Sequence, residues 1–404
     1  MPTRSQVCTW IAGFGLVVVP SLARAQERTE RDVVELIVRD GPRARAIRAE
    51  SEVTRREQET RLAYPNPAVT YSRESAGFTE FLQAEQSLPL FGARAALLRA
   101  GVAATAAADA DRDVRLWGLR SDAAAAAVRL VAEQARLEVA HGYVREVEGL
   151  IEILRTRELE GEGSRFDRLR AEQELRDARQ LATAASVSAV EARAALSGLL
   201  PRDVGLTRIA GAIDPQPPPV AADKLMAKAT STRAELRALQ HLAEHATLET
   251  DAARRARLPS PNLFGGFKRA DDVSGRQMGS VFGLSVSLPV FDAGGREANR
   301  WAAERTRVDA EREAIEYRIR SEIIGASEVL SMRQAALSQE QQGAPDELVQ
   351  IAEVAYREGE IGILELLDAV RTSSRARIRS IELRLDARLA QIALERAVGD
   401  TLWP

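Results

Sequence analysis

The chain repeats itself once, and this repeat constrains its fold more than any other feature. Short stretches of the first half recur in the second half, in the same order and at offsets of 196, 200 and 198 residues: 61–66 as 257–262, 87–92 as 287–292, and 160–162 as 358–360. A near-constant offset indicates a tandem duplication. We therefore predict two structural repeats, 26–200 and 222–404, joined by a proline-rich extended linker at 201–221.

Both halves are expected to have the same order of elements. In each, a helix ends at a Pro-Asn pair, a β-hairpin follows at about 67–88 or 262–289, and a long helical hairpin closes the half. The long helices are predicted at 93–160 and 295–357, the second interrupted near Gly343 and Pro345. Glycines mark the two hairpin tips, at Gly161 and Gly359. The predicted fold class is mainly α with a small β part.

The predicted helix lengths fit one another. At 1.5 Å per residue, the helix 93–160 spans about 100 Å. The return helix 164–199 and the helix 42–63 before the strands together span about 87 Å. One long helix is therefore expected to lie beside two shorter ones placed end to end.

Composition supports long helices packed side by side. Only 4% of the residues are aromatic although 45% are hydrophobic, and alanine, glutamate, arginine and leucine dominate. The formal net charge of −3 gives no reason to expect a nucleic-acid partner.

The first 25 residues read as a secretory signal peptide. Arg4 precedes an apolar run at 10–19, which is too short for a transmembrane helix, and 23–25 is a small-x-small cleavage site. Cys8 is the only cysteine and leaves with this segment, so the mature chain has no disulfide framework and no thiolate chemistry. We expect export to an oxidising envelope compartment.

The β-segments suggest how such a chain meets a membrane. No later segment reaches the roughly 18 apolar residues of a transmembrane helix. One strand alternates instead, placing apolar side chains on a single, lipid-facing side: Phe282, Leu284, Val286 and Leu288. The alternative is an ordinary amphipathic hairpin on a soluble sheet. Two hairpins give four strands, and the smallest membrane barrels need about eight, so several chains would have to share one barrel.

The whole plan resembles the TolC-like outer membrane factors of efflux and secretion systems. The resemblance rests on the Pro-Asn pairs at 65–66 and 261–262, on the strand-to-helix passages 87–92 and 287–295, and above all on 356–369. Within the family, the chain looks most like the CzcC-like cation-efflux branch. The resemblance implies a homotrimer with a twelve-stranded outer-membrane barrel and a periplasmic helical tunnel. It also implies a periplasmic adaptor (membrane fusion protein) and an inner-membrane RND-type pump as partners.

The resemblance also assigns site residues. Glu365 and Asp368 match the family's acidic aperture positions, and at i and i+3 they share one helix face. Repeated by symmetry they would form carboxylate rings that favour cations, whereas the alternative is a solvated, exposed face. In the first half Asp167 is equivalent to Glu365, but Arg170 replaces the second carboxylate. The tips at Gly161 and Gly359 match the adaptor-docking turns.

Two other functions are compatible with parts of the sequence. The stretch 241–245 has the pattern H-x-x-E-H, in which His241 and His245 are weak candidate metal ligands and Glu244 a base of a zinc protease. No third ligand is evident, so we expect no enzyme activity, no resident metal and no cofactor. A soluble periplasmic coiled-coil adaptor or scaffold is the other alternative. The sequence leaves open whether the cargo is a metal ion or an organic compound.

Overall fold

The computed structural model describes most of the chain. The described residues are 28–74, 79–90, 92–217, 221–272, 275–288, 291, 294–340 and 345–403. The predicted signal peptide and Cys8 lie outside them.

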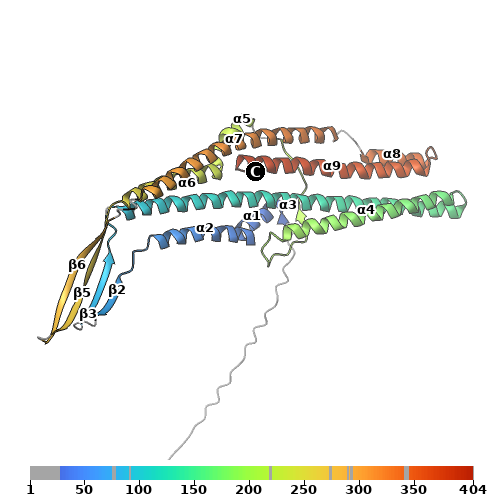
Figure 1. The fold of residues 1–404 in the computed structure, drawn as a ribbon. Coiled ribbons are helices and arrows are strands. Elements are labelled where there is room, and N and C mark those ends of the chain that lie inside the picture. The colour runs from blue at the N-terminus through green and yellow to red at the C-terminus, as the bar shows by residue number, and fades with distance from the viewer. Residues whose placement is uncertain are drawn as a thin grey trace, which may run out of the picture.

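The first half is built around one very long helix. Helix α3 (Ala93–Glu160) has 68 residues and runs almost the length of the molecule (Figure 1). Beside it, α2 (Pro42–Arg61) and α4 (Arg165–Ser197) lie end to end, as the helix lengths predict. The short α1 (Glu30–Asp40) precedes α2 and starts with a capping box between Thr29 and Asp32.

The second half has the same order of elements. It contains α5 (Ala222–Thr232), α6 (Ala234–Arg255), α7 (Gly295–Glu340), α8 (Pro345–Arg357) and α9 (Ile363–Val398). The predicted long helix is divided, since α7 ends at Glu340 and α8 starts at Pro345. Proline suits the first turn of a helix, where its missing N–H would have no intrahelical partner, but it breaks a helix interior. Gly343 lies outside the described residues.

A strand pair that we did not predict joins the chain's beginning to the linker. β1 (Arg28–Thr29) pairs in parallel with β4 (Ile209–Ala210). Ile209 is fully buried against α1 and α3, together with Val33 and Leu130. Two-residue strands have no periodicity to detect, which explains why the sequence pattern does not show them.

Four strands form one antiparallel sheet at the end of the molecule away from the helical tips (Figure 1). The order is β2 (Ala68–Glu74), β3 (Thr79–Ser87), β5 (Ser260–Asp272) and β6 (Gly275–Ser287). β3 pairs with β5, so the hairpins of the two halves join into one sheet. The strands β5 and β6 extend further toward their turn than the apolar alternation indicated, because charged and glycine residues continue the pairing there.

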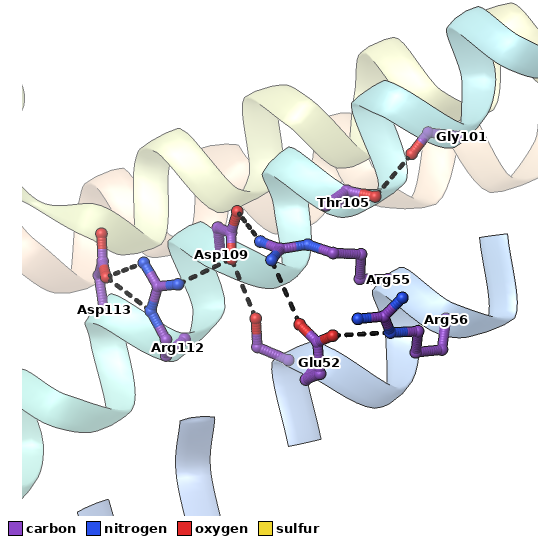
Figure 2. A network of polar contacts seen from close by, with 9 residues as sticks. Glu52, Arg55, Arg56, Gly101, Thr105, Asp109, Arg112 and Asp113 are labelled. Atoms are coloured by element: carbon purple, nitrogen blue, oxygen red, sulfur yellow. Dashed lines mark hydrogen bonds and ion pairs between the residues drawn. The ribbon is translucent and has the colours of Figure 1, made fainter. Parts of the chain in front are cut away.

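Small residues allow the helices to pack closely. Ala96, Ala100 and Ala103 are buried on α3, which contacts α6 along this stretch. Polar contacts add to this packing on the α2 side of α3, where Ser51 donates a 3.0 Å hydrogen bond to Asp109 and Arg55 approaches the same carboxylate (Figure 2). Among the described residues, no helix carries an apolar stretch of the length that a bilayer crossing needs.

Candidate functional site at the helical tips and the sheet

The two helical hairpins turn at glycines. Gly161 has φ 79° and Gly359 has φ 77°, in the left-handed region that favours glycine. After each glycine the next amide closes a bond across the turn: Glu162 N–H donates to the Arg157 carbonyl at 2.9 Å and Glu360 N–H to the Ala355 carbonyl at 2.8 Å. An added Cβ would meet no neighbour within 4 Å at either glycine, so both turns are open to solvent in the single chain.

The tips of the two halves lie side by side. The guanidinium of Arg157 in α3 sits 5.0 Å from the ring centre of Tyr356 in α8. Behind the tips, one apolar cluster joins α3, α4, α8 and α9, with Leu154, Leu366 and Leu367 among its buried members. Helices 200 residues apart in the chain are thus fixed against each other at this end.

Glu365 and Asp368 occupy the exposed face of the first turns of α9. Both side chains are exposed, whereas Leu366, Leu367 and Val370 between and after them are buried. The N-terminal end of a helix carries partial positive charge, which favours carboxylates there. Two adjacent carboxylates therefore face out from the tip region of the second half.

The first half has a different arrangement at the equivalent positions. Asp167 is partly buried in the first turn of α4, and Arg170 is exposed one turn later. The opposite charges on α4 do not make a paired acidic motif, as the sequence indicates.

A buried polar network, which sequence reasoning missed, ties α9 to the first hairpin. Glu174 in α4 is buried and accepts hydrogen bonds from the Tyr143 hydroxyl of α3 and from Arg371 of α9, whose Nε lies 2.9 Å away. Arg371 is one turn beyond Asp368. The network therefore joins the helix that carries the exposed carboxylates to the hairpin of the other half.

Hydrogen bonding decides the charge state of this network. Burial alone would raise the pKa of the Glu174 carboxyl, but hydrogen bonds from Arg371 and Tyr143 outweigh burial and hold that pKa below its usual range. Burial, followed by the Glu174 hydrogen bond, raises the pKa of the Tyr143 hydroxyl. The Glu174 hydrogen bond raises the pKa of Arg371. Glu174 is thus an anion paired with a cation between two helices.

The sheet at the opposite end has one apolar and one polar face. Side chains alternate along a strand, and the register places Leu263 opposite Leu284 and Tyr71 opposite Leu82. We call this the outer face; its apolar members include Val69, Tyr71, Leu82, Leu263, Phe267, Phe282, Leu284 and Val286, all strongly exposed. The other face carries mainly small and polar residues: Thr70, Ser72, Gln83, Glu85, Asn262, Lys268 and Ser285.

The predicted lipid-facing residues fall on this outer face. Phe282 is 79% exposed and Leu284 is 61% exposed, and Val286 continues the row. Leu288 follows the last residue of β6 and is also exposed. Exposed large apolar side chains on one face of a sheet indicate a surface that something apolar covers.

The histidine pair lies in a structural setting. The Nδ1 atom of His245 is 2.9 Å from the carbonyl oxygen of Ala100, and its ring packs edge-on against Trp301. His241 is near Glu244, at 3.7 Å between Nδ1 and the carboxylate. Within the part of the chain that the structure describes, no three side chains of the metal-binding types are grouped as a metal site would need.

Known proteins share the fold of this chain. Residues 225–400 match the family described as outer membrane efflux protein. Crystal structures of CusC, which concern transmembrane channel formation, give a TM-score of 0.72 at 17% identity, covering 93% of this chain and 92% of that chain. The Campylobacter jejuni CmeC outer membrane channel gives 0.72 at 15% identity, covering 92% and 85%. The open state of the Neisseria gonorrhoeae MtrE outer membrane channel gives 0.70 at 20% identity, covering 92% and 89%. A comparison with curated protein sequences gave no match.

The neighbours and the family are channels, and their fold confirms the predicted class, mainly helical with a small sheet. The match of residues 225–400 to the family and a fold shared along more than nine-tenths of the chain confirm the predicted likeness to the outer membrane efflux proteins, the TolC-like outer membrane factors.

Proposed function

We propose that three copies of this chain form the passive exit duct of a tripartite efflux system in the outer membrane. The observation that carries the proposal is the four-stranded sheet, whose outer face is apolar and exposed and whose edge strands, β2 and β6, each lack a second partner among the described residues.

Open sheet edges support a shared barrel. Unpaired N–H and C=O groups are costly in lipid, so a membrane sheet has to close on itself. Four strands are too few for closure, whereas β6 of one copy pairing with β2 of the next gives twelve strands in a trimer. The apolar outer face then meets lipid, and the polar face lines the passage.

The helices would continue this passage into the periplasm. α3 alone spans about 100 Å, and the apolar residues left exposed on α4 and α7, such as Val187 and Met332, supply surface for neighbouring copies. At the far end, the turns at Gly161 and Gly359 are the proposed docking points for a periplasmic adaptor, which links the duct to an inner-membrane RND-type pump.

Glu365 and Asp368 are the proposed aperture residues. Two exposed carboxylates per chain become rings under threefold symmetry, and rings of carboxylates attract cations and repel anions. This chemistry and the likeness to the cation-efflux branch favour heavy-metal cations as the cargo, with organic compounds as the alternative. Deletion of the gene should then sensitise cells to particular metal salts; sensitisation to organic compounds alone would contradict the cation proposal.

Assembly in detergent tests the duct itself. The full chain should fractionate with outer membranes, and the purified protein should have a trimeric mass and form ion-conducting pores in planar bilayers. Recovery of a soluble periplasmic monomer would instead support the coiled-coil adaptor or scaffold.

A further inference from the structure

A row of charged side chains crosses all four strands on the outer face of the sheet. It consists of Arg73 on β2, Glu80 on β3, Arg269 and Asp271 on β5, and Arg276 on β6. The register places Glu80 directly opposite both Arg73 and Arg269, and Asp271 opposite Arg276. The closest contacts are 3.5 Å from Arg269 to Glu80 and 3.3 Å from Arg276 to Asp271. We call these five residues the arginine row.

The arginine row lies where the apolar part of the outer face ends. The row lies near the turns between the strands, at the end of the sheet that is farthest from the helices (Figure 1). Between Leu288 and Met278 the chain advances about 33 Å. A strand tilt of about 40° reduces this to about 25 Å in height, which is the usual height of the lipid-facing band of a membrane barrel. The row therefore begins about where hydrocarbon should stop.

The row has more positive than negative charge. Three arginines and two carboxylates give the row a net charge of +1 per chain. The side chains of Arg276 and Arg73 are 66% and 53% exposed. A guanidinium has five N–H donors, which is more than one carboxylate can accept. The planar guanidinium group is well suited to bind a phosphate through two parallel hydrogen bonds.

An aromatic side chain adjoins the row on the lipid side. Tyr71 shares the outer face, and its hydroxyl donates a 3.3 Å hydrogen bond to Glu80. Tyrosines with an apolar ring in lipid and a polar hydroxyl in the headgroup region are typical of the membrane interface. Tyr71 thus places the row at headgroup level.

We propose that the arginine row binds the phosphate groups of the phosphorylated glycolipid that forms the outer leaflet of the membrane. The proposal rests on the proposed function, because it requires the outer face to meet lipid with the helices on the periplasmic side. The row would hold the barrel at a fixed depth, with its net positive charge and exposed guanidinium groups against lipid phosphates. The competing explanation is a ladder of ion pairs that only stabilises the strand pairing.

Lipid binding to the purified trimer separates the two explanations. The probes are diphosphorylated lipid A, lipid A from which both phosphates have been removed, and phosphatidylethanolamine, each titrated and counted by native mass spectrometry. The R73Q/R269Q/R276Q variant should lose roughly 100-fold in affinity for diphosphorylated lipid A, at about fivefold per arginine. Its affinity for the other two lipids should be unchanged. A control with three exposed arginines of the helical body replaced, R56Q/R305Q/R312Q, should bind like the unaltered chain.

A second variant guards against a purely structural effect. E80Q/D271N breaks the same ion pairs but keeps the arginines, so it should bind diphosphorylated lipid A at least as tightly as the unaltered chain. If both variants bind like the unaltered chain, or if both lose affinity equally for all three lipids, the proposal is wrong. Failure of the chain to form trimers or pores would overturn the proposed function instead, so the two failures are distinguishable.

Discussion

At the scale of single residues, the most consequential group is the buried carboxylate of Glu174. Its partners Tyr143 and Arg371 come from α3 and α9, so one anion holds three helices near the tips. Removing one member of a buried, hydrogen-bonded charge network leaves the others incompletely paired. The resulting loss of folding stability is larger than the stability that an exposed ion pair contributes.

The variant Glu174→Gln should therefore destabilise each chain by roughly 2 kcal/mol. Urea unfolding of the trimer in detergent, monitored by circular dichroism, measures this change in the free energy of unfolding. The matched control is Glu152→Gln, because Glu152 is an exposed glutamate of α3 whose one ion pair among the described residues is with Arg155, one turn away. Equal stability of the two variants would contradict a structural role of the network.

The pH dependence follows from the lowered pKa of Glu174. The folded chain holds this pKa below the ordinary glutamate value of about 4.3, so folding favours the ionised form. The stabilisation is complete above that ordinary value and is lost as the pH falls through the folded pKa. Unfolding midpoints recorded from pH 7 to pH 3 should fall less steeply at the acid end in Glu174→Gln than in the unaltered chain.

At the scale of elements, the sheet depends on which face of a strand a side chain occupies. Leu284 and Ser285 are neighbours in β6 and have similar backbone surroundings, but they lie on opposite faces. In the proposed barrel, a charge on the lipid-facing side would cost free energy that rises with depth, whereas a charge on the passage side would stay in water.

Leu284→Asp should consequently destabilise the barrel by roughly 2 kcal/mol per chain and reduce the amount of trimer in outer membranes. Ser285→Asp is the control and should assemble normally. Quantitative immunoblots of unheated membrane fractions measure the amount of trimer that each variant forms. A harmless Leu284→Asp would favour the soluble adaptor or scaffold, whose strands tolerate charge on either face.

At the scale of the whole molecule, the two proposed functional regions lie at opposite ends of α3. The sheet is at one end and the glycine tips are at the other, so a helix of about 100 Å separates the proposed membrane crossing from the proposed aperture. Only symmetry can turn two exposed carboxylates at the tip into a selective ring.

Replacing both proposed aperture carboxylates, as E365Q/D368N, should reduce the cation preference of the proposed pore. Reversal potentials in planar bilayers under a potassium chloride gradient measure this preference, which should move toward zero when the fixed negative charge is removed. The control variant E52Q/E59Q changes two glutamates of α2, far from the tips, and should leave the reversal potential unaltered. Unchanged selectivity in E365Q/D368N would mean that these side chains lie outside the narrowest point.

Sequence by itself determined the elements and their order. The duplication, the Pro-Asn pairs, the glycines at 161 and 359 and the alternation in 282–288 are local patterns, and local backbone preferences decide such features. The short strands β1 and β4 and the ends of β5 and β6 were exceptions. The pairing of β5 with β6 continues past the apolar alternation, because cross-strand hydrogen bonds hold residues whose side chains carry no strand pattern.

Tertiary structure alone decided which distant residues meet. Glu174 and Arg371 are 197 residues apart, and their pairing depends on the rotation of two long helices about their axes. Helix rotation is set by packing along the whole interface, including the buried leucines and alanines behind the tips. The arginine row likewise exists only because β3 of the first half pairs with β5 of the second, which brings Glu80 opposite Arg269. Neither contact leaves a periodic trace in the chain, and both lie where the two repeats join.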